Sequence, residues 1–111
     1  MNTLKIYLRN EMVNEIPSTF NDNDYRLVVD VVLIDEVFND TTNDILQKVY
    51  STAQNEDETG WVARFTGMKT PERSLSVGDV IQLKDELYIV DSVGFSKIDW
   101  NFKEFLRKLW L

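Results

Sequence analysis

The fold class is decided by residues 79–93, which read Asp-Val-Ile-Gln-Leu-Lys-Asp-Glu-Leu-Tyr-Ile-Val-Asp-Ser-Val. Two short apolar runs, about 79–83 and 87–93, are separated by the polar turn Lys84-Asp85-Glu86. β-branched and aromatic residues in runs of this length favour strands, and a short polar turn between two such runs predicts a β-hairpin. The hairpin makes antiparallel pairing the starting point for the rest of the sheet.

Three further segments have the pattern of strands. Residues 3–9 alternate apolar and polar side chains, residues 25–34 are almost entirely apolar and β-branched, and residues 61–66 alternate again. Asp30 interrupts the second of these, and a buried carboxylate without a partner is costly. We therefore expect Asp30 to face solvent, to pair with a base such as Arg64, or to contact a partner. The polar residues 10–24 are expected to form a loop.

Two segments have helical periodicity. Within residues 42–54, apolar side chains recur on one face after a group of capping residues at 40–44, and residues 101–110 show the same spacing after Asp99 or Asn101 as cap. Strands grouped in this order favour an α+β fold. We predict a single domain over residues 1–111, with a mostly antiparallel sheet of about five strands and two helices (about 42–54 and 101–110) packed against it.

Acidic residues are concentrated in one half of the chain. The formal net charge is −7, and residues 10–60 carry twelve acids against two bases, whereas residues 61–111 carry seven acids and eight bases. Phosphate neutralisation drives most nucleic-acid binding, so this distribution disfavours nucleic acid and favours a basic protein as partner. The alternative is that the charge serves solubility alone.

Catalysis is not expected. The chain has no histidine and no cysteine, which excludes most triads, thiol chemistry and zinc sites. Asp79 with Lys84 resembles part of a nuclease pattern, but Gln82 stands where a second acid is needed. Asp22 and Asp24 begin like a calcium loop that lacks its glycine and its closing glutamate. We expect no enzyme, cofactor or metal; a magnesium-dependent carboxylate site would be the remaining enzymatic alternative.

Residues 70–83 and 87–95 read as one unit, containing Arg-Ser-Leu-Ser-Val-Gly-Asp-Val-Ile at 73–81 and Asp-Ser-Val-Gly-Phe at 91–95. This unit resembles the YodL-like domain of Firmicutes. The resemblance implies a protein of a phage, plasmid or integrative element. Small acidic proteins of such elements often disarm host defence, and the chain looks like a small type II anti-CRISPR protein. The expected partner is then a host protein, with Cas9 or another basic nucleic-acid-binding effector first, in the bacterial cytoplasm and without a membrane anchor.

The acidic surface supplies the predicted contacts of an inhibitor that imitates DNA. They are the acids of three polar segments: Asp22, Asp24, Asp35, Glu36, Asp40, Glu56, Asp57 and Glu58. The alternative function is a YodL-like regulator that binds a host cytoskeletal or metabolic protein through an apolar surface with exposed aromatics such as Trp61, Trp100 or Trp110. Core packing is the competing interpretation for these tryptophans. A monomer and a homodimer both fit the sequence.

Overall fold

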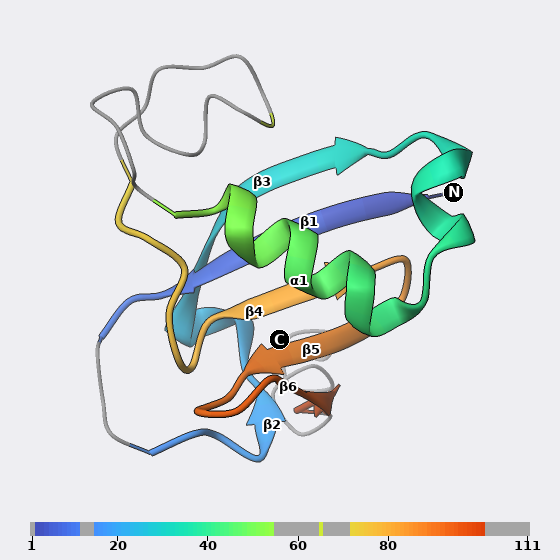
Figure 1. The fold of residues 1–111 in the computed structure, drawn as a ribbon. Helices are drawn as coiled ribbons and strands as arrows, with labels where there is room; N and C mark the ends of the chain where they lie inside the picture. The colour runs from blue at the N-terminus through green and yellow to red at the C-terminus, as the bar shows by residue number, and fades with distance from the viewer. Residues whose placement is uncertain (1, 12–14, 55–64, 66–71, 102–111) are drawn as a thin grey trace.

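The computed structural model describes residues 2–11, 15–54, 65 and 72–101 (Figure 1). Their order is β1 (Thr3–Arg9), β2 (Thr19–Phe20), a 3-10 turn η1 (Asp22–Asp24), β3 (Tyr25–Val32), a second 3-10 turn η2 (Asp35–Asn39), α1 (Thr42–Thr52), β4 (Val80–Leu83), β5 (Glu86–Val90) and β6 (Phe95–Trp100). In this part of the chain no helix is long and apolar enough to cross a membrane.

The strands form one curled, mixed sheet. Its order is β2-β6-β5-β4-β1-β3, and every neighbouring pair is antiparallel except β2 with β6, which is parallel. β3 carries a bulge, because Ile6 and Tyr7 are consecutive on β1 whereas their partners Val29 and Leu27 are not consecutive on β3. The bulge places one extra residue, Val28, in the outermost strand.

One face of the sheet is covered by α1, which crosses in front of β1, β4 and β5 (Figure 1). The helix begins where the Thr41 hydroxyl accepts a hydrogen bond from the Asp44 N–H. Its apolar side chains pack on alternate residues of the strands, with Phe65 and Phe95 at the edge of this core. The buried members of this first core include Leu4, Ile6, Leu8, Val29, Ile45, Leu46, Val49, Ile81 and Leu83.

The opposite face of the sheet has a smaller, aromatic core. Phe20 of β2 lies between the rings of Tyr7 and Tyr25, with centroids 4.9 Å away in both cases, and its ring also meets Trp100 at 4.8 Å. Val80, Leu87 and Ile89 complete this second core. The parallel pairing of β2 with β6 thus places Phe20 against the second face of the sheet.

Several predictions about the fold are confirmed. β1 has the predicted bounds, α1 and β3 begin where they were expected, and β4 and β5 form the predicted hairpin. The predicted fold class, however, was wrong: the sheet has six strands and is mixed, and the described residues contain one α-helix.

The physical reasons for the error lie in β2 and β6. β2 has two residues, too few to show any periodicity, and lies inside the segment predicted to be a loop. In β6, Ile98 and Trp100 alternate with polar residues, but Asp99 was interpreted as the cap of a helix at 101–110. Residues 102–110 of that helix, and the predicted strand 61–66 apart from Phe65, lie outside the described residues. Phe65 itself has a helical conformation, so the prediction of a strand is wrong at that residue.

Candidate functional site

An acidic surface surrounds η2 and the first turn of α1. We call it the η2 cluster; it consists of Asp35, Glu36, Asp40 and Asp44, all of them exposed. The sequence contains no lysine or arginine between residues 27 and 47. Lys48, one turn further along α1, pairs with Asp40, which raises the pKa of the Lys48 ammonium. The remaining carboxylates keep the surface strongly negative.

The backbone explains why these acids stay at the surface. Asp35 and Glu36 lie in the first turn of η2, and Asp44 lies in the first turn of α1. Carboxylates are favoured at these positions because backbone N–H groups are exposed there. The Asp35 carboxylate also accepts a hydrogen bond from the side-chain amide of Asn2. Local structure therefore fixes the backbone beneath the η2 cluster while its charges point outward.

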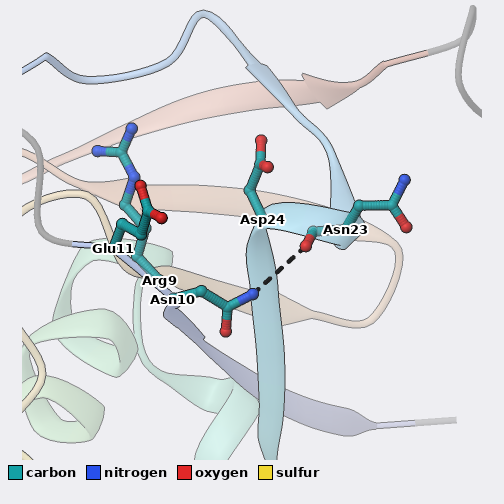
Figure 2. Close-up of a pocket in the computed structure, with 5 residues that line it drawn as sticks. All are labelled: Arg9, Asn10, Glu11, Asn23 and Asp24. Carbon is teal, nitrogen blue, oxygen red and sulfur yellow. Dashed lines mark hydrogen bonds between the residues drawn. The ribbon is translucent and has the colours of Figure 1, made fainter.

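A second acidic surface lies at η1, beside a polar pocket of about 350 Å³ (Figure 2). Arg9, Asn10, Glu11, Asn23 and Asp24 line this pocket, and the Asn10 amide donates a hydrogen bond of 3.3 Å to the Asn23 carbonyl. The carboxylates of Glu11 and Asp24 point to the same side of it (Figure 2). Arg9 also lines the pocket, so its charge partly offsets these acids.

The structure separates the predicted contact residues into two groups. Asp22 and Asp24 precede β3, whereas Asp35, Glu36 and Asp40 follow it. The eight residues of β3 lie between the groups, and at roughly 3.3 Å per residue they span about 25 Å. Glu56, Asp57 and Glu58 lie outside the described residues. Asp44 was not among the predicted contacts, although its place in the same acidic run could have indicated it.

The motif at residues 73–81 holds a buried carboxylate. Asp79 is 0% exposed, and the Arg73 guanidinium donates to both of its oxygens, at 2.6 and 2.7 Å. The backbone N–H groups of Arg9 and Ser76 donate to the same carboxylate at 2.8 Å. Arg73 also donates to the Arg9 carbonyl at 3.0 Å. A carboxylate with all of these donors ties the segment before β4 to the end of β1, so its role is structural.

A tight turn supports that carboxylate. The Asp79 N–H donates to the Ser76 carbonyl at 3.0 Å, and Gly78 has φ +93°, as the third residue of a type II turn requires. The Tyr25 hydroxyl donates to the Gly78 carbonyl at 2.7 Å, and burial raises the pKa of Tyr25 to about 12. The turn is thereby bonded to β3 as well as to β1.

A small cavity of about 200 Å³ lies between α1 and the loop that joins β5 to β6. Tyr50 and Phe95 line it, with ring centroids 6.2 Å apart, together with Gln47 and Asp91. Hydrogen bonds from the Ser92 N–H and from the Ser96 hydroxyl lower the pKa of the Asp91 carboxyl. These bonds hold the loop, so we assign Asp91 a structural role.

Of the three tryptophans named for an apolar interface, the structure describes Trp100. It is half-buried and packs against Phe20 at the second core. Trp61 and Trp110 lie outside the described residues. Three of the exposed large apolar side chains lie on β3 or just after it, namely Leu27, Val32 and Ile34. The prediction named tryptophans, so it did not include these aliphatic residues.

In the part of the chain that the structure describes, no group of three or more acids lies close enough together to hold a metal ion. Glu11 and Asp24 are the two acids that line the larger pocket.

No family model, curated protein or solved structure matches this chain. Its function is therefore argued from its own surface.

Proposed function

We propose that this chain is a non-catalytic anti-defence protein of a phage or mobile element that binds and inhibits a host protein in the bacterial cytoplasm. The target is a basic nucleic-acid-binding effector, with the type II CRISPR effector Cas9 as the specific candidate. The observation that carries the proposal is the η2 cluster, in which four exposed carboxylates occupy ten residues of chain. We also propose, from the motif at residues 70–95, that the chain is related to YodL-like domains and to small type II anti-CRISPR proteins.

Charge and spacing support a nucleic-acid channel as the target. Cas9 holds a heteroduplex in a strongly positive channel and recognises it through its backbone. The η2 cluster and the acids at η1 lie about 25 Å apart, which corresponds to about seven phosphates along one strand at ~3.4 Å each. Carboxylates at this separation offer a basic channel two contacts in place of phosphates. Complementary charge of this kind speeds association and makes it sensitive to salt.

The experiment is cleavage of a matched DNA target by guide-loaded Cas9, with this protein added before the DNA. We expect stoichiometric loss of cleavage that weakens as salt is raised. The test variant is Asp35→Asn with Glu36→Gln. Its matched control is Asp85→Asn with Asp99→Asn, which removes the same charge from two exposed acids outside the η2 cluster.

The two double variants separate a specific surface from net charge. On our proposal the η2 variant loses inhibition and the control keeps it. Equal loss in both variants means that overall charge, and not the η2 cluster, carries the effect. Full cleavage at large excess of the unmodified protein removes Cas9 as the target.

A second candidate function is favoured by the apolar side chains along β3. A YodL-like regulator that binds a host cytoskeletal or metabolic protein would use an apolar surface, and Leu27, Val32 and Ile34 provide one. Salt discriminates between the two functions, because an apolar contact is not weakened by ionic strength. Retention of the target in high salt, recovered by pull-down from a Firmicute lysate, would favour this second function.

A further inference from the structure

β3 has an outer edge at which backbone hydrogen-bonding groups point away from the sheet. Among the described residues it pairs with β1 alone and is the last strand in the sheet order (Figure 1). The Leu33 N–H donates to the Asn2 carbonyl at 2.7 Å, so Leu33 and Asn2 form a hydrogen-bonded pair. In an antiparallel ladder such pairs alternate with pairs whose backbone groups point outward.

This alternation assigns a direction to each residue of β3 after the bulge. Val29 and Val31 bond to β1, whereas Asp30 and Val32 direct their N–H and carbonyl groups away from it. A bond on the far side of β1 agrees with this, since the Lys84 N–H donates to the carbonyl of Thr3, the residue opposite Val32. The outer edge therefore offers a donor and an acceptor at both Asp30 and Val32.

The side chains along this edge are apolar with one acid among them. Val32 is 67% exposed and Ile34 is 68% exposed, and Leu27 beyond the bulge is 47% exposed. The side chains of Asp30 and Val32 lie on the same face as Lys5 and Thr3, their partners on β1. Edge strands are normally protected against pairing by charge or bulges, and here protection by the Val28 bulge ends before Asp30.

We propose that the outer edge of β3, from Asp30 to Ile34, binds an extended segment of the target protein as an added strand. The segment carries apolar side chains beside Val32 and Ile34 and a lysine or arginine beside Asp30. Recognition of this type takes its affinity from main-chain hydrogen bonds and its specificity from alternate side chains. The inference deepens the proposed function and rests on it only in requiring a protein target.

Charge identifies the occupant as a basic segment of another protein. Asp35 and Glu36 follow the edge directly, and both are exposed. A basic strand would approach Asp30 and these two acids together; because Lys5 lies opposite Asp30 on β1, Asp35 and Glu36 would supply most of the attraction. A second copy of this chain would instead bring the same acids of both copies to the seam, on molecules that each carry a net charge of −7.

The probe is a peptide whose every second residue is lysine, valine and valine in turn, so that on one face the lysine can lie beside Asp30 and the valines beside Val32 and Ile34. Amide hydrogen exchange followed by NMR is the readout. In the free protein we expect fast exchange at Asp30 and Val32 and slow exchange at Val29 and Val31. With the peptide bound, the amides of Asp30 and Val32 become protected. The same peptide with glutamate in place of that lysine serves as the charge control and should give no protection.

Two variants test the edge itself, and a third serves as their control. Val32→Pro removes an outward N–H and leaves the ladder to β1 intact, which proline at a strand edge allows. We expect at least about a tenfold weaker peptide affinity, from the loss of that donor and of the adjacent pairing. Val77→Pro is the matched control, because Val77 is an exposed valine at the second position of a type II turn, where proline is favoured. Val32→Lys, which keeps the backbone, should also weaken binding.

The outcomes separate this inference from the proposed function. Protection by the lysine peptide without inhibition of Cas9 supports the edge and removes Cas9 as the target. Inhibition of Cas9 that is unchanged in Val32→Pro and Val32→Lys overturns the edge while the proposed function stands. Absence of protection by the lysine peptide, equal protection by both peptides, or a self-associated dimer that Val32→Lys dissociates would each overturn the inference.

Discussion

The Arg73 guanidinium binds both oxygens of the Asp79 carboxylate, at 2.6 and 2.7 Å, although Asp79 is fully buried and Arg73 is not. This bidentate pair joins a segment that follows α1 to the strand β4 at the centre of the sheet. The pair raises the pKa of Arg73 through its hydrogen bonds, so the guanidinium stays charged. A buried carboxylate with one arginine partner and two backbone donors is a point at which the fold can be tested.

Asp79→Asn is expected to lower the free energy of unfolding by about 3–5 kcal/mol, as breaking one side of a buried pair does. The asparagine amide would face Arg73 without the negative charge that the guanidinium binds, and the N–H groups of Arg9 and Ser76 would compete for one oxygen. Urea denaturation measures the loss. Arg73→Lys, which keeps the charge but not the two-point contact, should lose less; a loss under ~1 kcal/mol for Asp79→Asn would contradict the structural role.

Gly78→Ala should destabilise the protein by about 1–2 kcal/mol, since φ is +93° at Gly78 and other residues are strained there. An added Cβ would also lie 3.0 Å from Nη1 of Arg9, a flexible side chain that can move aside. The backbone conformation is therefore the larger cost. Thermal unfolding compares this variant with Gly94→Ala, where φ is +78° but no atom lies within 4 Å of the added Cβ. A similar loss in both variants would confirm that conformation dominates, and no loss in either would contradict it.

Stability should fall as pH rises from 10 toward 12. Burial raises the pKa of Tyr25 to about 12 from its ordinary value of 10.0, so the folded protein keeps a proton that the unfolded chain releases. The contribution is thus fully present below pH 10 and is lost as pH approaches the folded pKa. Burial raises the pKa of Tyr7 as well, and its hydroxyl donates to Gln82 at 3.0 Å.

Tyr25→Phe removes the titrating group and the hydrogen bond to the Gly78 carbonyl, so it should be less stable at neutral pH by about 1–3 kcal/mol. Its stability should also fall less steeply between pH 10 and 12 than that of the unmodified protein. Tyrosinate absorbance during an alkaline titration gives the pKa directly. Titration of Tyr25 near its ordinary value would contradict the burial argument.

The sequence predicts elements well where periodicity is long and poorly where it is short. β1 and α1 show alternating or helical periodicity, and β3 shows a long β-branched run, so all three were recognised and contribute to the first core. The nearly continuous apolar run of β3 indicates a central strand, however, and that was wrong, because β3 lies at the edge of the sheet. β2 is specified by Phe20, whose ring fills the second core between Tyr7, Tyr25 and Trp100. A single residue that acts through distant contacts leaves no local pattern, and the parallel pair of β2 with β6 could not be predicted.

The composition of the candidate site and the separation of its two groups were predictable, whereas the contacts of Asp79 were not. An acidic run without bases indicates an exposed negative surface, and Asp35, Glu36 and Asp40 are exposed. Its division into two groups follows from β3, and the strand predicted over residues 25–34 already separates Asp24 from Asp35. The role of Asp79 depends on Arg73 and on the Arg9 backbone, the latter 70 residues away in the chain.

Phe20→Ala is expected to cost about 3–5 kcal/mol, because it empties the centre of the second core. The Phe20 ring is 1% exposed and contacts three other aromatic rings. The loss should appear first in β2 and β6, since Phe20 and Trp100 are paired there. Amide exchange of Asn101, which donates to the Phe20 carbonyl at 2.8 Å, reports this local opening. Uniform loss of protection across both cores would instead show that the second core does not open separately.

Lys48→Gln is expected to strengthen inhibition of guide-loaded Cas9 on the proposed function. Lys48 pairs with Asp40 and is the base nearest in sequence to the η2 cluster, so its removal leaves that surface more negative. Lys97→Gln is the matched control, because Lys97 is also an exposed lysine paired with one acid, Glu86, on the β5–β6 hairpin. We expect about a two- to fivefold gain in inhibitory potency for Lys48→Gln at low salt and little change for Lys97→Gln.

High salt provides the decisive comparison between these lysine variants. The gain of Lys48→Gln should disappear at high ionic strength, since exposed charges separated by more than a Debye length are screened. Cleavage assays across a salt series measure this for both variants and for the unmodified protein. An equal gain in both would assign the effect to net charge. Weaker inhibition by Lys48→Gln would mean that Lys48 itself contacts the target, and the η2 cluster would then not act as a surface for a basic partner.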